Sequence, residues 1–142
     1  MLTREPLPDG FVLVKGTSRT TFRELTPGVI LLIAAGPGEE SLDVEVLREL
    51  SLAVDRRQRL TIFADLSNLN GISITSSKVA IRWVRQNRSS ISAGHLLVRQ
   101  VAVGIAVSMI GSVFGGSVSS YTQTVLFEAA IRQRVPGFAG SR

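Results

Sequence analysis

Between Arg99 and Glu128 the chain carries no charged residue, and the first half of this stretch, VAVGIAVSMIGSVFG, is almost wholly apolar. Such a stretch is either a membrane span or the interior of a folded domain. A spanning helix needs about 20 consecutive apolar residues, whereas a run of about 10–14 is typical of a buried element. The dense run, from Val101 to Phe114, covers about 14 residues before GGSVSSYTQT follows. We therefore expect a buried central segment and no membrane span.

Length and composition indicate one globular domain. The chain has 142 residues, of which 44% are hydrophobic and 19% charged, which suits a single core. It contains no cysteine, which excludes disulfides, thiolate metal ligands and a thiol nucleophile, and which fits a cytoplasmic protein. The net charge of +5 favours anionic partners, but no basic motif is interleaved with aromatic residues, so we expect no nucleic-acid binding. The start, MLTREPLPDG, has no apolar run, which predicts a mobile arm over residues 1–10 rather than a signal peptide.

The first half of the chain predicts strands followed by a helix. FVLVKG, over Phe11–Gly16, is a strand candidate, and TFREL and VILLIAA, over Thr20–Leu25 and Val29–Ala35, are joined by a Pro-Gly turn that suits a hairpin. VILLIAA has no polar alternation, so we expect a central strand buried on both faces. A helix is predicted over SLDVEVLRELSLAVDRR, with Ser41 as its N-cap and an apolar stripe at Val46, Leu47, Leu50, Ala53 and Val54.

A buried strand and a second helix come next. LTIFADLSNL, over Leu60–Leu69, predicts a buried strand that ends in a polar loop, and the following helix is expected from about Ser76 to Arg88. Val79, Ala80, Trp83 and Val84 would share its buried side. On its other side the spacing i, i+4, i+7 aligns three cations, Lys78, Arg82 and Arg85.

The charge-free stretch divides into short elements. A loop at residues 92–94 precedes HLLVRQVAVGIAV, which predicts a β-branched strand centred on Val101–Val107. The glycine-rich segment over Ser108–Ser119 is expected to form a closely packed helix. TVLF, over Thr124–Phe127, predicts a short final strand. EAAIRQRV then predicts a last helix, which Pro136 and Gly137 end. This alternation of strands and helices predicts an α/β fold.

The order of these elements and the segments LTIFADLSNLNGIS and TVLFEAAIRQRV resemble the STAS-like family, which includes the bacterial anti-sigma-factor antagonists. The resemblance covers about residues 20–138 as an order of elements, and Asp65-Leu66-Ser67 at the level of residues. It implies a single STAS-like α/β domain over residues 11–138, with residues 139–142 as a tail. That domain would have a mixed central sheet, an N-terminal hairpin and about four helices.

Proteins of this kind can be phosphorylated on a serine at the start of the helix after this turn, typically within Asp-Ser-Ser-Gly. The matching region here is Ser73-Ile74-Thr75-Ser76-Ser77-Lys78, in which Thr75 replaces the acid and Lys78 the glycine. The resemblance makes Thr75, Ser76 and Ser77 candidate phosphorylation sites, because a helix N-terminus stabilises phosphate. Capping of the helix by these hydroxyl groups is the alternative.

The residues do not predict catalysis or a metal. His95 is the single histidine, with an expected surface or edge role at a loop-to-strand boundary, and metal sites need clustered ligands. A Ser67–His95–Asp65 triad would lack a nucleophile-elbow sequence. The Gly36-Pro37-Gly38 turn lacks both the Walker lysine and the full dinucleotide-binding pattern, so it predicts an ordinary turn. Asp65 ends a central strand where α/β proteins bind ligands, or its carboxylate caps the following turn.

We therefore expect a cytoplasmic, non-enzymatic regulatory domain without cofactor or metal that docks a protein, such as a regulatory kinase or an anti-sigma-like protein. The docking surface would be the loop from Asp65 to Ser73 and the start of the following helix. Its predicted contact residues are Asp65, Ser67, Asn68, Ser73, Lys78 and Arg82. The alternative is binding of a small apolar or lipid-like ligand in a cavity lined by residues 101–118. The sequence leaves the oligomeric state open.

Overall fold

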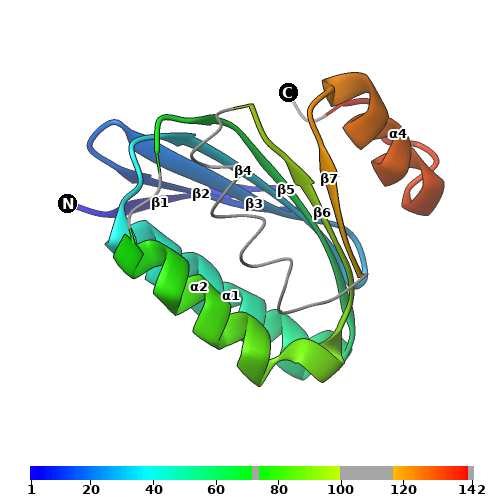
Figure 1. Cartoon of the computed structure of the whole chain (residues 1–142), viewed down its shortest axis with the longest axis horizontal. Helices are drawn as coiled ribbons and strands as arrows, with labels where there is room; N and C mark the ends of the chain where they lie inside the picture. The colour runs from blue at the N-terminus through cyan, green and yellow to red at the C-terminus, as the bar shows by residue number, and fades with distance from the viewer. Residues whose placement is uncertain (72–73, 100–116, 141–142) are drawn as a thin grey trace.

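The structure is a computed structural model, and it describes residues 1–71, 74–99 and 117–140. In these residues seven strands form one sheet in the order β1-β2-β3-β4-β5-β6-β7, and three α-helices flank it (Figure 1). The strands are β1 (Thr3–Leu7), β2 (Gly10–Lys15), β3 (Ser18–Thr26), β4 (Val29–Gly36), β5 (Leu60–Leu69), β6 (Ile91–Leu97) and β7 (Val118–Tyr121). The helices are α1 (Glu40–Arg57), α2 (Ile74–Gln86) and α4 (Thr124–Arg134), with a short 3-10 turn at Arg88–Ser90.

The sheet is mixed, as the sequence predicted. Strands β1 to β4 form an antiparallel meander, and β4 to β7 are parallel. The crossovers β4-α1-β5 and β5-α2-β6 run in the same direction across the sheet and share one hand, so α1 and α2 lie on the same face. Helix α4 lies on the opposite face, against β6 and β7 (Figure 1).

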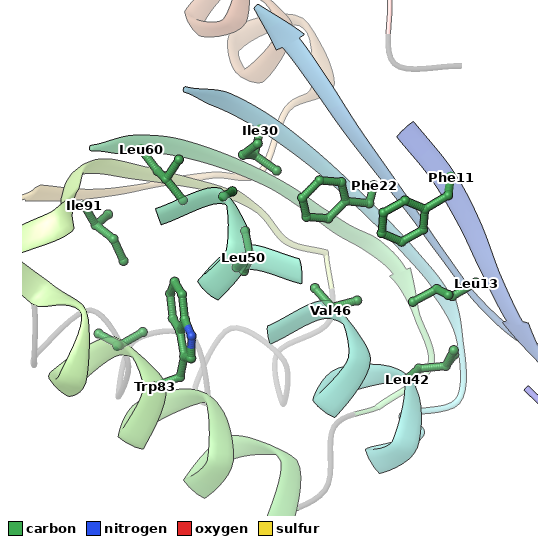
Figure 2. Packing of buried hydrophobic residues seen from close by; sticks show 12 residues of the cluster. Phe11, Leu13, Phe22, Ile30, Leu42, Val46, Leu50, Leu60, Trp83 and Ile91 are labelled. Carbon is green, nitrogen blue, oxygen red and sulfur yellow. The ribbon is translucent and has the colours of Figure 1, made fainter. Parts of the chain in front are cut away.

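Two hydrophobic cores hold these layers to the sheet. Under α1 and α2, Leu50 and Trp83 pack with residues from the antiparallel and parallel strands alike, among them Phe22 and Leu60 (Figure 2). Under α4, the core contains Val29, Leu31, Phe63, Leu97, Phe127, Ile131 and Phe138. The central strand β4 therefore serves both cores, which explains why VILLIAA shows no polar alternation.

The N-terminal segment corrects one prediction. Residues 1–10 were expected to form an arm, but Thr3–Leu7 form the edge strand β1, which pairs antiparallel with β2. Arg4 ties this strand to the rest of the domain. Its guanidinium forms an ion pair with Glu49 of α1 and lies 3.8 Å above the Phe11 ring centroid.

Two predicted helix starts also differ from the structure. Ser41 is not the N-cap of α1, because Glu39 occupies that position and makes no side-chain cap hydrogen bond. Ser41 instead donates to Glu39 Oε1 and accepts a hydrogen bond from Lys15 of β2. Helix α2 begins at Ile74, two positions before the expected Ser76.

The elements after α2 depart most from the prediction. The expected loop at residues 92–94 is part of β6, because parallel pairing with β5 and β7 outweighs the weak strand propensity of Ser, Ala and Gly. The predicted strand HLLVRQVAVGIAV begins within β6, which contains His95–Leu97, and its centre at Val101–Val107 lies outside the described residues. So does most of the predicted helix at Ser108–Ser119, whose last residues, Val118 and Ser119, belong to β7.

TVLF is not a strand, since Thr124–Phe127 form the first turn of α4. Phe127 and Ile131 stand four residues apart, are fully buried on one helix face, and anchor α4 to the sheet. The strand-like composition of TVLF is outweighed by this packing. The described residues thus contain three α-helices where about four were expected. No helix in the described ranges has both the length and the apolarity that crossing a membrane requires.

Candidate functional site

The Asp65-Leu66-Ser67 motif forms a bulge within strand β5. The Ser67 backbone N–H and hydroxyl both donate to Asp65 Oδ1, at 3.0 and 2.5 Å. The register between β4 and β5 shifts at this point, from Ile33 opposite Asp65 to Ala35 opposite Asn68. A short polar side chain that accepts a hydrogen bond from the backbone N–H two residues later stabilises a local turn of the chain. Here the hydrogen bonds between Asp65 and Ser67 stabilise the motif within the strand, which continues to Leu69 without a turn at Asp65.

This geometry corrects the predicted docking loop. Asp65 and Ser67 lie inside a strand and are buried, with 0% and 7% of their surface exposed. Asn68, directly after the bulge, is exposed. Ser73 lies outside the described residues. Asp65 and Ser67 therefore shape the end of β5, and Asn68 is the predicted residue that they present at the surface.

The start of α2 separates the three candidate phosphorylation sites. Thr75 is exposed, Ser77 is half-buried, and Ser76 is 2% exposed. The Ser76 hydroxyl forms a hydrogen bond with the carboxyl of Asp43 on α1. Burial raises the pKa of Asp43, and the hydrogen bond from Ser76 opposes this rise. Ser76 thus joins the N-terminal ends of the two helices.

A cationic stripe, which we define as Lys78, Arg82 and Arg85, runs along the exposed side of α2. These three side chains and the half-buried Ile81 line a shallow groove of about 250 Å³. Among the described residues, no ion pair involves any of the three cations. The predicted positions Lys78 and Arg82 therefore lie together on one surface.

Trp83 fixes the orientation of this stripe. Its ring is buried in the core beneath α1 and α2 (Figure 2). The indole Nε1 donates a hydrogen bond of 2.8 Å to Ser51 Oγ on α1, and Ser51 in turn donates to the Leu47 carbonyl. With Trp83 and Val84 buried, the cations of α2 must face outward.

His95 does not meet Ser67 and Asp65 in a triad. It lies inside β6, where its ring stacks on Phe63 at 4.4 Å and its Nδ1 is 2.9 Å from the Tyr121 hydroxyl. Burial lowers the pKa of His95, and the charge of Arg134 on α4 lowers it further. His95 therefore belongs to the packing of the α4 face. The described residues contain no cluster of three or more potential metal ligands.

The Gly36-Pro37-Gly38 turn has a structural explanation. Gly36 has a φ of +86°, and a Cβ atom there would lie 2.3 Å from the Thr17 carbonyl oxygen. Only glycine fits such a position without strain. The Ser18 hydroxyl also donates to the Pro37 carbonyl at 2.6 Å. The glycine thus lets the chain pass close to β3 before α1 begins.

Comparison with solved structures identifies the fold. An uncharacterized protein of the DUF3478 family from Shewanella loihica PV-4, with a SpoIIAA-like fold, is similar with a TM-score of 0.58 and 10% identity, over 92% of this chain and 91% of that chain. The anti-sigma factor antagonist SpoIIAA in its unphosphorylated form is similar with a TM-score of 0.57 and 16% identity, over 85% of this chain and 99% of that chain. The chain has a STAS-like fold. No protein-family model matches the sequence of this STAS-like domain, and neither does any curated protein.

The predicted surface residues of this STAS-like domain thus fall into two groups. Lys78 and Arg82 lie together on α2, and Asn68 is exposed at the end of β5. The sequence did not predict two contacts between the helices: Ser76 forms a hydrogen bond with Asp43 of α1, and Trp83 forms one with Ser51 of α1. No local pattern marks such contacts, because they join elements that only tertiary packing brings together.

Proposed function

We propose that this chain is a non-enzymatic regulatory domain that docks a protein partner in the cytoplasm, such as a regulatory kinase or an anti-sigma-like protein. The docking surface is formed by Asn68 and the cationic stripe of α2. Its STAS-like fold supports a regulatory role, since SpoIIAA, one protein with this fold, is an anti-sigma factor antagonist. The observation that carries the proposal is the cationic stripe, since exposed charges that form no ion pair within the described residues are well placed to meet an external partner.

The bulge in β5 supports this assignment in a second way. Asp65 and Ser67 bond each other inside the strand and fix the path of the chain up to Asn68. A docking surface gains affinity when it is held in one conformation before the partner arrives. In this proposal Asp65 and Ser67 are positioning residues, and Ser73 completes the predicted surface.

Phosphorylation, if this domain is regulated in that way, is best placed at Thr75. Thr75 is the exposed member of the three candidates and stands in the first turn of α2. Phosphate there would be stabilised by the helix N-terminus. It would also lie one turn from Lys78, so its added charge would alter the docking surface. Ser76 is disfavoured by its burial against Asp43.

Charge reversal on α2 tests the docking surface. Proteins captured by the tagged chain are compared between the unchanged chain and the variant Lys78→Glu/Arg82→Glu, with circular dichroism to check the fold. The matched control is Arg19→Glu/Arg56→Glu, which alters two exposed arginines elsewhere and changes the net charge equally. We expect the α2 variant alone to lose its partner. Equal capture by all three proteins would refute the docking surface.

A second candidate function is the binding of a small apolar ligand. An apolar cavity of about 170 Å³ lies between the sheet and the N-terminal halves of α1 and α2, where its lining includes Leu32, Leu42, Leu66 and Ala80. An apolar cavity of about 150 Å³ can hold a molecule the size of benzene. Residues 101–118, the predicted lining, are almost all outside the described residues. Native mass spectrometry tests this function, and a purified protein at its sequence mass alone would count against it.

A further inference from the structure

We propose that the partner segment received by α2 is an acidic α-helix that lies along the cationic stripe, a proposal that rests on the docking function above. The sequence has no aspartate or glutamate between Asp65 and Glu128. Its cations in that range are Lys78, Arg82, Arg85, Arg88 and Arg99. The surface built by α2 therefore has a single sign of charge, which selects an anionic partner.

The spacing of the stripe indicates a helical partner. Lys78, Arg82 and Arg85 stand at i, i+4 and i+7, so they span about 10 Å along one side of α2. A second helix with carboxylates at the same spacing matches this row, because both helices repeat every 3.6 residues. Ile81 lies between the cations and is half-buried in the groove, so it can receive one apolar side chain of the partner.

The neighbouring helix limits how wide the partner can be. Helix α1 packs against α2 on the same face of the sheet. It carries three arginines against five carboxylates, Glu40, Asp43, Glu45, Glu49 and Asp55. A nucleic acid or an anionic membrane is wide enough to meet both helices, and α1 offers its phosphates little attraction, because Arg48 pairs with Glu45 and Arg57 pairs with Glu24. A single helix about 10–12 Å in diameter can follow the stripe alone.

The aromatic residue of α2 also argues against nucleic acid. Single-stranded nucleic acids bind aromatic side chains on which bases stack. Trp83 is the one aromatic residue of α2 and is 8% exposed, with its indole N–H bonded to Ser51. The stripe thus offers charge and one aliphatic contact but no stacking platform, which suits an acidic helix with one apolar side chain better than unpaired bases.

Defined peptides test the proposal directly. The probe is a labelled alanine-rich helical peptide with glutamates at i, i+4 and i+7 and one leucine beside them. A peptide of the same composition with its glutamates spread around the helix is the control. We expect the first peptide to bind at least about tenfold more tightly by fluorescence anisotropy and to weaken as salt rises from about 50 to about 500 mM. Lys78→Glu/Arg82→Glu should abolish this difference, and Arg19→Glu/Arg56→Glu should keep it.

Two results would overturn the acidic-helix proposal. One is equal binding, or no binding, of the two peptides. The other is tighter, Lys78- and Arg82-dependent binding of a DNA duplex or of vesicles containing phosphatidylserine. Either result can occur while the capture experiment still shows a protein that depends on Lys78 and Arg82. In that case the docking function stands and only the identity of the segment is wrong.

Discussion

Helices α1 and α2 lie side by side on one face of the sheet, yet they use their charges differently. Charged residues of α1, or directly beside it, form ion pairs with strands of the sheet: Arg4–Glu49, Lys15–Glu39 and Arg57–Glu24. Among the described residues, the cations of α2 form none. The polar contacts of α2 with α1 include the hydrogen bonds of Ser76 with Asp43 and of Trp83 with Ser51. Charges of α1 thus contribute to the fold, whereas those of α2 are the ones that our proposal assigns to a partner.

The largest predicted effect comes from removing apolar packing under α1. Leu50 is 3% exposed within the core beneath α1 and α2. Leu50→Ala should lower the free energy of unfolding by about 2–5 kcal/mol in urea titrations, because a cavity replaces packed atoms. Leu52→Ala on the exposed side of α1 is the control and should change it by at most about 0.5 kcal/mol. Similar losses for both would contradict the assigned core face.

A smaller effect is expected at the hydrogen bond that joins the two helices. Trp83→Phe keeps an aromatic ring but removes the donor to Ser51, so stability should fall by about 1 kcal/mol. Circular dichroism is the measurement, because Trp83 is the single tryptophan and its fluorescence is lost. A double-mutant cycle with Ser51→Ala should show coupling between the two changes. Strict additivity would mean that α2 is not held to α1 by this bond.

The ion pair at the end of α1 should contribute less, and only above acidic pH. Two hydrogen bonds from Arg57 lower the pKa of Glu24. A carboxylate whose pKa is lowered by folding stabilises the fold at pH values above its ordinary pKa. This stabilisation is lost as the pH falls through the lowered pKa. Arg57→Ala should therefore lower the free energy of unfolding slightly near neutral pH. In urea titrations over a series of pH values, the difference in unfolding free energy between this variant and the unchanged chain should vanish below the lowered pKa of Glu24. A difference that increased at acidic pH would contradict the ion pair.

The smallest effect is expected at the cationic stripe itself. Lys78→Ala/Arg82→Ala/Arg85→Ala should change the free energy of unfolding by no more than about 0.5 kcal/mol, because these exposed side chains have no ion pair in the described structure. Thermal and urea unfolding measure this directly. A loss above about 1 kcal/mol would show that the stripe stabilises the fold and would remove the contrast between α1 and α2.

Local patterns predicted the elements from β2 to α2 well, although they missed the edge strand β1. The hairpin β3-β4, the helix α1 and the strand β5 were each predicted, because turn residues and apolar spacing are visible in the sequence itself. After α2 the prediction was wrong at the start of β6 and at the start of α4, whereas the last helix over EAAIRQRV was confirmed for Glu128–Arg134. Ser92, Ala93 and Gly94 are typical of loops, and TVLF is typical of a strand, yet strand pairing and the burial of Phe127 with Ile131 decided otherwise.

The same division holds for the candidate site. The sequence by itself determined the cationic stripe, because helical spacing alone places Lys78, Arg82 and Arg85 on one side. It also pointed to the STAS-like fold through the order of elements. Tertiary structure decided that Asp65 and Ser67 are buried in a bulge of β5 and that Ser76 faces Asp43. Burial depends on which distant segments pack together, and the spacing of residues along one element does not contain that information.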